Sequence, residues 1–243
     1  MWKEIGQDKF LDHEHFFERF DVNQTMIDST FSGYTPGRLF VSEKNGDMLL
    51  LANFGFAFGV TQDSFDFLKE LSERDHKTYT FIPRKGLKIE DKKLFKRLGF
   101  KGISSLDNVK KILARDLSSF ELGRLDASNG TLSSWPEVIE GIFGSIENFG
   151  KAGGFTLLDG EIIAAESMIG FKGKDNIEIG TITHEKYRGK GLSTYICAYL
   201  VKDLVDKGFS PYWSCNASNI GSKKVAENLG FNEPFEYDAI PTK

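Results

Sequence analysis

The stretch that decides the fold reads His184-Glu185-Lys186-Tyr187-Arg188-Gly189-Lys190-Gly191-Leu192-Ser193-Thr194. It follows residues 176–183, whose alternating pattern predicts a strand, and it leads into residues 191–207, where Leu or Ile recurs every fourth position as in a helix. Three cations and two glycines therefore lie at a helix N-terminus. Free amide N–H groups and the helix dipole attract anions there, and glycine lets an anion approach the backbone. The stretch predicts a phosphate-binding loop.

A solvated basic turn is the alternative interpretation of this loop. Residues 118–243 carry 12 basic and 17 acidic side chains, so an acidic segment concentrates three cations at one helix start, which favours the phosphate loop. Two nucleotide motifs are excluded. A Walker A loop needs Ser or Thr after Gly189-Lys190, and a dinucleotide fingerprint needs glycine where Thr194 stands.

The segment Arg188-Gly-Lys-Gly191-Leu-Ser193 resembles the Arg/Gln-x-x-Gly-x-Gly/Ala signature of the GNAT acyltransferase superfamily. Asn219, Gly230 and Phe231 are similar to the pattern that follows in that family, with Ser222 at its usual Ala position. The resemblance covers about residues 118–243. The strings at 180–192 and 213–216 look more narrowly like a two-domain bacterial subgroup that includes zwittermicin-type antibiotic resistance acetyltransferases.

This resemblance implies a GNAT fold of the α/β (α+β) class, with a mixed central sheet and flanking helices. It also implies an acetyltransferase that takes acetyl-coenzyme A (acetyl-CoA) as acetyl donor and passes the acetyl group to a primary amine of a small molecule, by direct attack in a ternary complex. The family's cofactor contacts would then fall on Ile182, Thr183, Arg188, Gly189, Lys190, Gly191, Leu192, Ser193, Thr194, Asn219 and Ser222.

Two residues depart from the family pattern. Ser193 replaces a small Gly or Ala and is expected to add a donor toward phosphate. Ala226 stands where many relatives carry a Tyr that protonates the departing thiolate. A thiol with a pKa of about 8.5 is a tolerable leaving group without that help, so activity is still expected. A non-catalytic acyl-CoA-binding sensor or regulatory module is the alternative that Ala226 raises, and a protein-interaction scaffold would need a loop that binds no anion.

Acetyl transfer to an amine also needs a base, because alkyl amines are mostly protonated at neutral pH. Glu178 is the first candidate, on the strand before the loop, where several family members carry their base. Glu166, in a mostly apolar stretch, and His184, at the start of the loop, are the rivals. Cys215 would suit a covalent mechanism, but a buried structural thiol is the expectation for it.

The chain also resembles itself at an offset of 131 residues. Residues 92–100 and 223–231 share Lys-Lys and, at the same spacing, Leu-Gly-Phe, and residues 78–82 and 211–215 both read as strands. We therefore expect a tandem pair, with a degenerate GNAT-like domain at residues 1–115 and the acetyltransferase domain at 116–243. The first copy has aromatic residues at 53–61 instead of the basic loop, so it cannot bind phosphate in the same way.

Periodicity predicts the elements of the second copy. A capped amphipathic helix begins at Ser134-Trp135-Pro136-Glu137 and reaches Phe149. It is followed by strands at 155–158, 161–169 and 176–183, a helix at 191–207, a strand at 211–215, a helix at 219–229 and a strand at 234–238. In the first copy, residues 92–100 should form a short helix that ends at Gly99.

Composition excludes several classes of protein. The chain of 243 residues has a net charge of −4, which disfavours a general nucleic-acid binder. No apolar run approaches the length of a membrane span, and no secretion signal is visible at Met1, so we expect a cytoplasmic protein without a membrane partner. Cys197 and Cys215 lack metal-site spacing, so no metal is expected. The acceptor and the oligomeric state are not readable from the sequence.

Overall fold

The structure is a computed structural model that describes residues 1–18, 20–89, 93–125, 139–149 and 152–243. The described part of the first half contains a four-stranded meander, a 3₁₀ segment, three α-helices and two further strands. Its elements are β1 (Trp2–Ile5), the 3₁₀ segment η1 (Gln7–Phe17), α1 (Gln24–Phe31), β2 (Gly37–Ser42), β3 (Met48–Ala52), β4 (Phe56–Gly59), α2 (Gln62–Arg74), β5 (Thr80–Pro83), β6 (Phe95–Phe100) and α3 (Asp107–Leu113).

The second half follows the predicted order of strands and helices. Its elements are β7 (Glu121–Leu125), the π-helical turn η3 (Ile139–Phe143), α5 (Ile146–Phe149), β8 (Gly154–Asp159), β9 (Ile162–Lys172), β10 (Asn176–Thr183), the 3₁₀ turn η4 (Glu185–Tyr187), α6 (Leu192–Asp206), β11 (Ser210–Asn216), α7 (Ile220–Leu229) and β12 (Pro234–Pro241). Every strand and helix predicted between residues 155 and 238 is confirmed.

The amphipathic helix predicted up to Phe149 is only partly correct. Its start at 134–137 lies outside the described residues. Over the described part, η3 ends at Phe143 and α5 begins at Ile146, so the helix is interrupted. Gly144 between them has a φ of +72°, a left-handed conformation that ends a helix and that glycine adopts without strain.

The described strands form one twelve-stranded mixed sheet in the order β1-β2-β3-β4-β5-β12-β6-β11-β10-β9-β8-β7. Neighbouring strands are antiparallel except in the two pairs β4–β5 and β10–β11. The same sequence of pairings therefore occurs twice, from β1 to β5 and from β7 to β11. Each five-strand unit is completed by the last strand of the other: β6 joins β11, and β12 joins β5. The mixed sheet with flanking helices confirms the predicted fold class, and the repeated topology supports a tandem pair.

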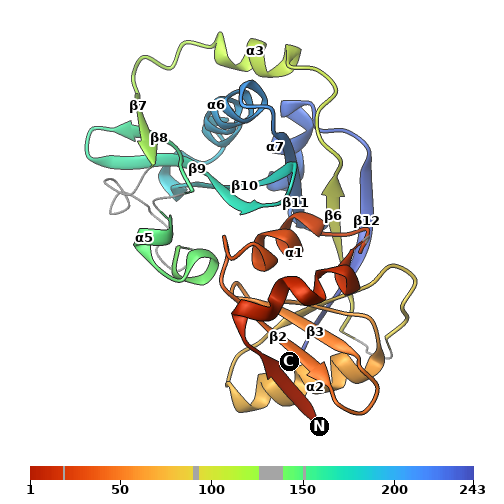
Figure 1. Ribbon diagram of the computed structural model, residues 1–243. Coiled ribbons are helices and arrows are strands. Elements are labelled where there is room, and N and C mark those ends of the chain that lie inside the picture. Colours follow the sequence, from red (N-terminus) through yellow and green to blue (C-terminus); the bar gives the residue numbers. More distant parts are fainter. Residues whose placement is uncertain (19, 90–92, 126–138, 150–151) are drawn as a thin grey trace.

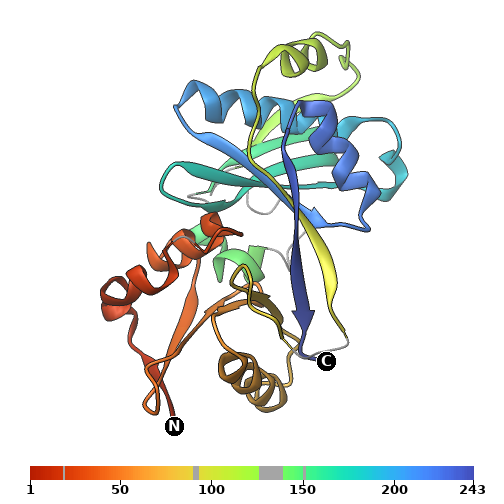
Figure 2. The same cartoon turned by 90° about the vertical axis from the view of Figure 1, so that its right-hand side faces the viewer.

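Strand exchange joins the two halves. β6 and β12 lie side by side and connect the upper and lower parts of the molecule (Figure 2). The domain boundary at residues 115/116 stays a prediction, because strands from both sides of this boundary belong to the same sheet.

One part of the internal comparison is wrong. Residues 95–100 form β6, whereas the segment aligned with them lies in α7, so the shared Leu-Gly-Phe relates a strand to a helix. The repeat is carried instead by α2 and α6, which begin at residues 62 and 192, and by β5 and β11, which begin at residues 80 and 210. Insertion between β11 and β12 provides β6 with backbone partners on both sides, which outweighs its weak local helical pattern.

Two hydrophobic layers fix the second half of the sheet. On one face, α6 packs against β8, β9 and β10, and its buried side chains belong to a core that includes Ile177 and Trp213 (Figure 1). On the other face, α1 and η3 contribute Met26, Ile142 and Phe143 to a second core, which also contains Met168 of β9. Among the described helices, none is long and apolar enough to cross a membrane.

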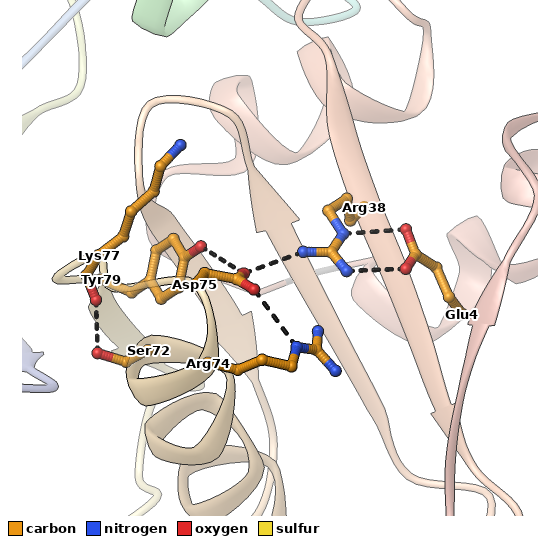
Figure 3. Close-up of polar contacts among 7 residues, drawn as sticks. All are labelled: Glu4, Arg38, Ser72, Arg74, Asp75, Lys77 and Tyr79. Carbon is orange, nitrogen blue, oxygen red and sulfur yellow. Dashed lines mark hydrogen bonds and ion pairs between the residues drawn. The ribbon is translucent and has the colours of Figure 1, made fainter.

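A polar cluster joins several elements of the first half (Figure 3). Arg38 on β2 donates two hydrogen bonds to the carboxylate of Glu4, at 2.8 and 2.9 Å, and a third to Asp75 at the end of α2. Tyr79 donates to the same Asp75 carboxylate at 2.9 Å. The pKa of Glu4 is lowered, chiefly by its hydrogen bond with Arg38. These contacts join β1, β2, α2 and β5, so the cluster is structural.

Gly99→Ala tests the insertion of β6. A Cβ at Gly99 would lie 2.5 Å from Cζ of Phe235 on β12 and 2.7 Å from the hydroxyl of Tyr212 on β11. We expect the variant to lower the free energy of unfolding by about 1–3 kcal/mol in denaturant titrations, the usual cost of overpacking. Lys101→Ala, at an exposed position beside the same strand, should stay within about 0.5 kcal/mol of wild type. Equal stability of Gly99→Ala and wild type would contradict the observed packing.

Candidate functional site

The site begins where the two parallel strands β10 and β11 separate. They pair over three positions, the last being Glu178 with Tyr212. Beyond this point β10 continues along β9 and β11 continues along β6. An irregularity of the β9–β10 register between Glu178 and Ile179 coincides with the separation. A wedge therefore opens between the strands.

The outer part of this wedge is a hollow of about 670 Å³, here called the loop cavity. Its walls come from the end of β10, the basic loop, the first turn of α6 and the first turns of α7. Ten of the eleven predicted cofactor-binding residues line it: Ile182, Thr183, Arg188, Gly189, Gly191, Leu192, Ser193, Thr194, Asn219 and Ser222. Lys190 lies outside this lining. Its ammonium sits over the ring of Tyr187, 5.1 Å from the centroid.

The N-terminus of α6 presents donors to this cavity. Gly191 holds the N-cap position with a φ of +74°, and no described side chain caps the helix. The first amide N–H groups of α6 therefore have no partner within the helix, and the residues of this first turn, Leu192, Ser193 and Thr194, line the loop cavity. By contrast, Thr61 and Ser64 cap the N-terminus of α2 with a reciprocal capping box. The N-terminus of α6 is thus open to a ligand, whereas the N-terminus of α2, the equivalent helix in the first half, is closed by its own side chains.

The first half also lacks the wedge. β4 pairs with β5 along its whole length, from Phe56–Thr80 to Gly59–Pro83. This observation agrees with the prediction that the aromatic residues at 53–61 do not repeat the basic loop.

Two cations near the loop were missed by sequence reasoning. Lys224 on α7 lines the loop cavity. Arg115 follows α3, and a Cβ at Gly191 would lie 3.1 Å from its Nη1. Both are far from the signature along the chain, and Arg115 belongs to the first half. The positive charge at the start of α6 therefore comes from three separate segments, since Arg188 also lies there with its Nε 3.3 Å from the carbonyl oxygen of Thr183.

Hydroxyl and amide groups at the junction of α6 and α7 are already oriented. Thr181 donates to the carbonyl oxygen of Glu166 at 2.7 Å, so the Ser193 hydroxyl, 3.1 Å from that of Thr181, is the donor in the second contact. Ser193 thus donates within the protein, and the expected donor toward phosphate is not seen. Asn219 accepts from the N–H of Ser222 at 3.0 Å and caps α7, which leaves its amide N–H₂ free to act as a donor.

The inner part of the wedge is a second hollow of about 320 Å³, here called the inner cavity. It shares Thr181, Asn219 and Ser222 with the loop cavity, so the two cavities are adjacent. Glu178 lies in the inner cavity and is only 7% exposed. Its Oε1 accepts a hydrogen bond from Ser214 at 2.6 Å, whereas its Oε2 has no hydrogen-bond partner among the described residues.

Burial raises the pKa of the Glu178 carboxyl above its ordinary value, and the hydrogen bond from Ser214 and the positive charge of Arg97 offset this only in part. A carboxyl of raised pKa is a stronger base than an exposed one. Glu178 therefore combines a position at the strand separation with an oxygen atom available to accept a proton.

A hydrogen-bonded chain holds Glu178 in place. Arg97 on β6 donates to the Ser214 hydroxyl at 3.0 Å and to the Tyr237 hydroxyl at 2.9 Å, and Tyr237 donates to Asn23 at 2.9 Å. Arg97 and Tyr237 belong to the exchanged strands β6 and β12. Sequence reasoning missed these residues, because no local motif places them beside β10.

The rival base candidates lie elsewhere. Glu166 is fully buried on β9 and lines neither cavity. His184 is exposed, and its Nδ1 accepts the N–H of Lys186 at 3.3 Å as the cap of η4. Cys215 does line the inner cavity, but it is buried, and burial raises the pKa of its thiol, which disfavours the thiolate that a covalent mechanism needs. Ala226 lies on α7, is fully buried in the core that α7 shares with α6, and provides no proton donor.

Comparisons with known proteins agree with this geometry. The sequence model of the family described as GNAT acetyltransferase matches residues 14–240. A Bacillus subtilis protein named "Uncharacterized N-acetyltransferase YdfB" is 31% identical over 99 residues, which make up 40% of this chain and 38% of that protein. The aligned part thus spans well under half of the length of this relative.

Solved structures share the fold across the whole chain. A GCN5-related N-acetyltransferase-like protein from Streptococcus suis superposes with a TM-score of 0.72 at 19% identity, covering 95% of this chain and 99% of its own. A tandem GNAT protein from the clavulanic acid biosynthesis pathway superposes with a TM-score of 0.60 at 11% identity, covering 100% and 98%. At these identities the likeness concerns the fold.

Proposed function

This chain belongs to the GNAT acetyltransferase family, and from that premise we propose that it transfers an acetyl group from acetyl-CoA to a primary amine of a small molecule, by direct attack in a ternary complex. The observation that carries this proposal is that the two cavities adjoin along β10 and share three lining residues. The loop cavity offers amide donors and cations to a pyrophosphate, and the inner cavity places a basic carboxylate at the other end of the same wedge.

The residues of the loop cavity fit acetyl-CoA. The uncapped start of α6 supplies backbone donors, and Arg188 and Lys224 supply charge, so together they would hold a pyrophosphate. Asn219 and Ser222, at the junction of the cavities, would hold the arm that reaches inward. When bound, acetyl-CoA supplies the acetyl group as a reactive thioester.

The residues of the inner cavity would prepare the acceptor. Glu178 would accept a proton from the ammonium group, directly or through water, and leave a neutral amine within reach of the thioester carbonyl. Ser214 and Arg97 would keep the carboxylate oriented. No Tyr stands at Ala226, so the thiolate would leave without a proton from that position.

The proposal is tested by measuring free coenzyme A released from acetyl-CoA in the presence of aromatic, aliphatic, polyamine and aminosugar acceptors, together with calorimetric binding of acetyl-CoA. Release that depends on an amine supports the proposal. Tight binding without release on any amine would instead support the acyl-CoA sensor. Amine antibiotics in the same panel test the narrower resemblance to zwittermicin-type resistance acetyltransferases.

Arg188→Ala is expected to weaken binding of acetyl-CoA roughly tenfold, because a charge-assisted contact with phosphate is lost. The remaining binding should depend less on salt, since one fewer ion pair is screened. Calorimetry at low and moderate salt measures both effects. Lys202→Ala, which removes a cation paired with Asp206 on the same helix, is the control and should bind as wild type does. Unchanged affinity of Arg188→Ala at low salt would reject the assignment of the loop.

A further inference from the structure

The inner cavity combines an apolar, partly aromatic lining with polar side chains such as Thr181, Asn216 and Asn219. Phe54 follows β3, Phe56 lies on β4 and Phe171 lies on β9, and all three line the cavity together with Met26, Ile142, Met168 and Trp213. The rings of Phe54 and Phe56 lie 6.0 Å apart and those of Phe54 and Phe171 lie 6.5 Å apart. Phe54 is 39% exposed, at the rim of the cavity. A partly aromatic pocket with one partly exposed ring and a single buried carboxylate is typical of a small-molecule site.

The charges in this cavity are few and mostly paired. Glu178 is the one carboxylate among the described lining residues, and Arg97 is the one guanidinium. Arg97 is engaged by Ser214 and Tyr237 and lies over the ring of Phe56, 4.9 Å from the centroid. The unpartnered Oε2 of Glu178 can match one ammonium group. A second ammonium would find no further carboxylate among the described lining residues and would lose hydration beside the phenyl rings.

The aromatic rim is held in position before any ligand arrives. Asn53, next to Phe54, donates to the carbonyl oxygens of Glu140 and Gly141 on η3, at 3.1 and 2.7 Å. A Cβ at Gly141 would lie 3.1 Å from the Phe54 ring, so the ring packs closely on this turn. The first half of the chain thus supplies a preformed wall to a site whose charged groups lie on β10 and β6. Preorganised walls of this kind favour a ligand of matching shape.

We propose that the acceptor is a monoamine carried on an apolar, aromatic-sized body, with its ammonium at Glu178 and its body against Phe54, Phe56 and Phe171. This inference rests on the proposed function and adds the substrate class to it. Faces of the phenyl rings also attract the ammonium before it loses its proton. The first half of the chain therefore determines specificity.

Steady-state kinetics with phenylethylamine, spermidine and glucosamine test the inference. We expect kcat/KM for phenylethylamine to exceed the values for the other two amines at least tenfold. Phe54→Ala should lower kcat/KM for phenylethylamine roughly tenfold and leave the values for the polar amines nearly unchanged, because the rim ring contacts the apolar body. Leu122→Ala, which removes a side chain of similar exposure (42%) on β7, is the matched control and should not alter the ranking.

Two results separate the inference from the proposed function. Acetyl transfer that favours spermidine or glucosamine, or a ranking unaffected by Phe54→Ala, overturns the inference and leaves the acetyltransferase proposal standing. If no amine is acetylated, the proposed function fails, and calorimetric binding of phenylethylamine decides the inference by itself. Binding that Phe54→Ala weakens and Leu122→Ala does not weaken supports the aromatic site, and absence of binding to the wild-type protein overturns it.

Discussion

Glu178→Gln is expected to slow acetyl transfer by about 10²–10⁴-fold, the usual range for a positioned base, with affinity for acetyl-CoA nearly unchanged. Gln keeps the size of the side chain and can still accept the hydrogen bond from Ser214, but it cannot accept a proton at neutral pH. Single-turnover rates and calorimetric binding on the same preparations separate the two quantities. Because Glu178 lies outside the loop cavity, the cofactor-binding residues should be undisturbed.

The pH dependence adds a second signature of the same base. Burial raises the pKa of Glu178, and the ionised form is the active one, so wild-type kcat/KM should fall with decreasing pH at values above the ordinary carboxyl range. This limb should be absent in Glu178→Gln. The deficit of the variant should shrink as the pH approaches the pKa of the amine, because the neutral amine then forms without the enzyme.

Two controls accompany this prediction. Glu166→Gln alters the rival carboxyl, which lines neither cavity, and should cost far less activity in molecules that remain folded. Circular dichroism and thermal unfolding establish the folded fraction of both variants. Wild-type turnover by Glu178→Gln across the pH range would remove Glu178 from the mechanism and place Glu166 first.

Gly191→Val is expected to reduce binding of acetyl-CoA at least about 100-fold. The φ of +74° disfavours a β-branched residue, and the added Cβ would lie 3.1 Å from the guanidinium of Arg115. Relief of either strain would move the first amides of α6 away from the pyrophosphate of acetyl-CoA. The loss of two charge-assisted hydrogen bonds between these amides and the pyrophosphate corresponds to about 3–6 kcal/mol. Calorimetry with acetyl-CoA measures the loss.

Gly208→Val is the matched control for backbone strain. Gly208 follows α6 at its other end, has a φ of +84°, and has no atom within 4 Å of an added Cβ among the described residues. The two variants should lose similar amounts of stability in thermal unfolding, whereas only Gly191→Val should lose the cofactor. Normal binding by Gly191→Val would mean that the glycine merely starts the helix.

The second half of the chain could be predicted because its signals are local. Alternation in β10 and four-residue spacing in α6 each depend on neighbours in the chain, and the structure places both elements as expected. The loop cavity follows from them, since an uncapped helix start is a local property of the backbone. The helix predicted at 92–100 failed for the opposite reason: its neighbours in the sheet are more than 100 residues away.

The sequence by itself therefore determined the order of elements in the second half and the basic start of α6, because both arise from short-range hydrogen bonding and periodicity, and its signature motif pointed to the fold class through a family resemblance. Only the tertiary structure decided the end of the site that we propose for the acceptor. The exchange of β6 and β12 brings Arg97 and Tyr237 to Glu178, and the packing of the two halves brings Phe54 and Phe56 to Phe171. These residues belong to separate elements, and their juxtaposition depends on long-range strand pairing and core packing that no local pattern encodes.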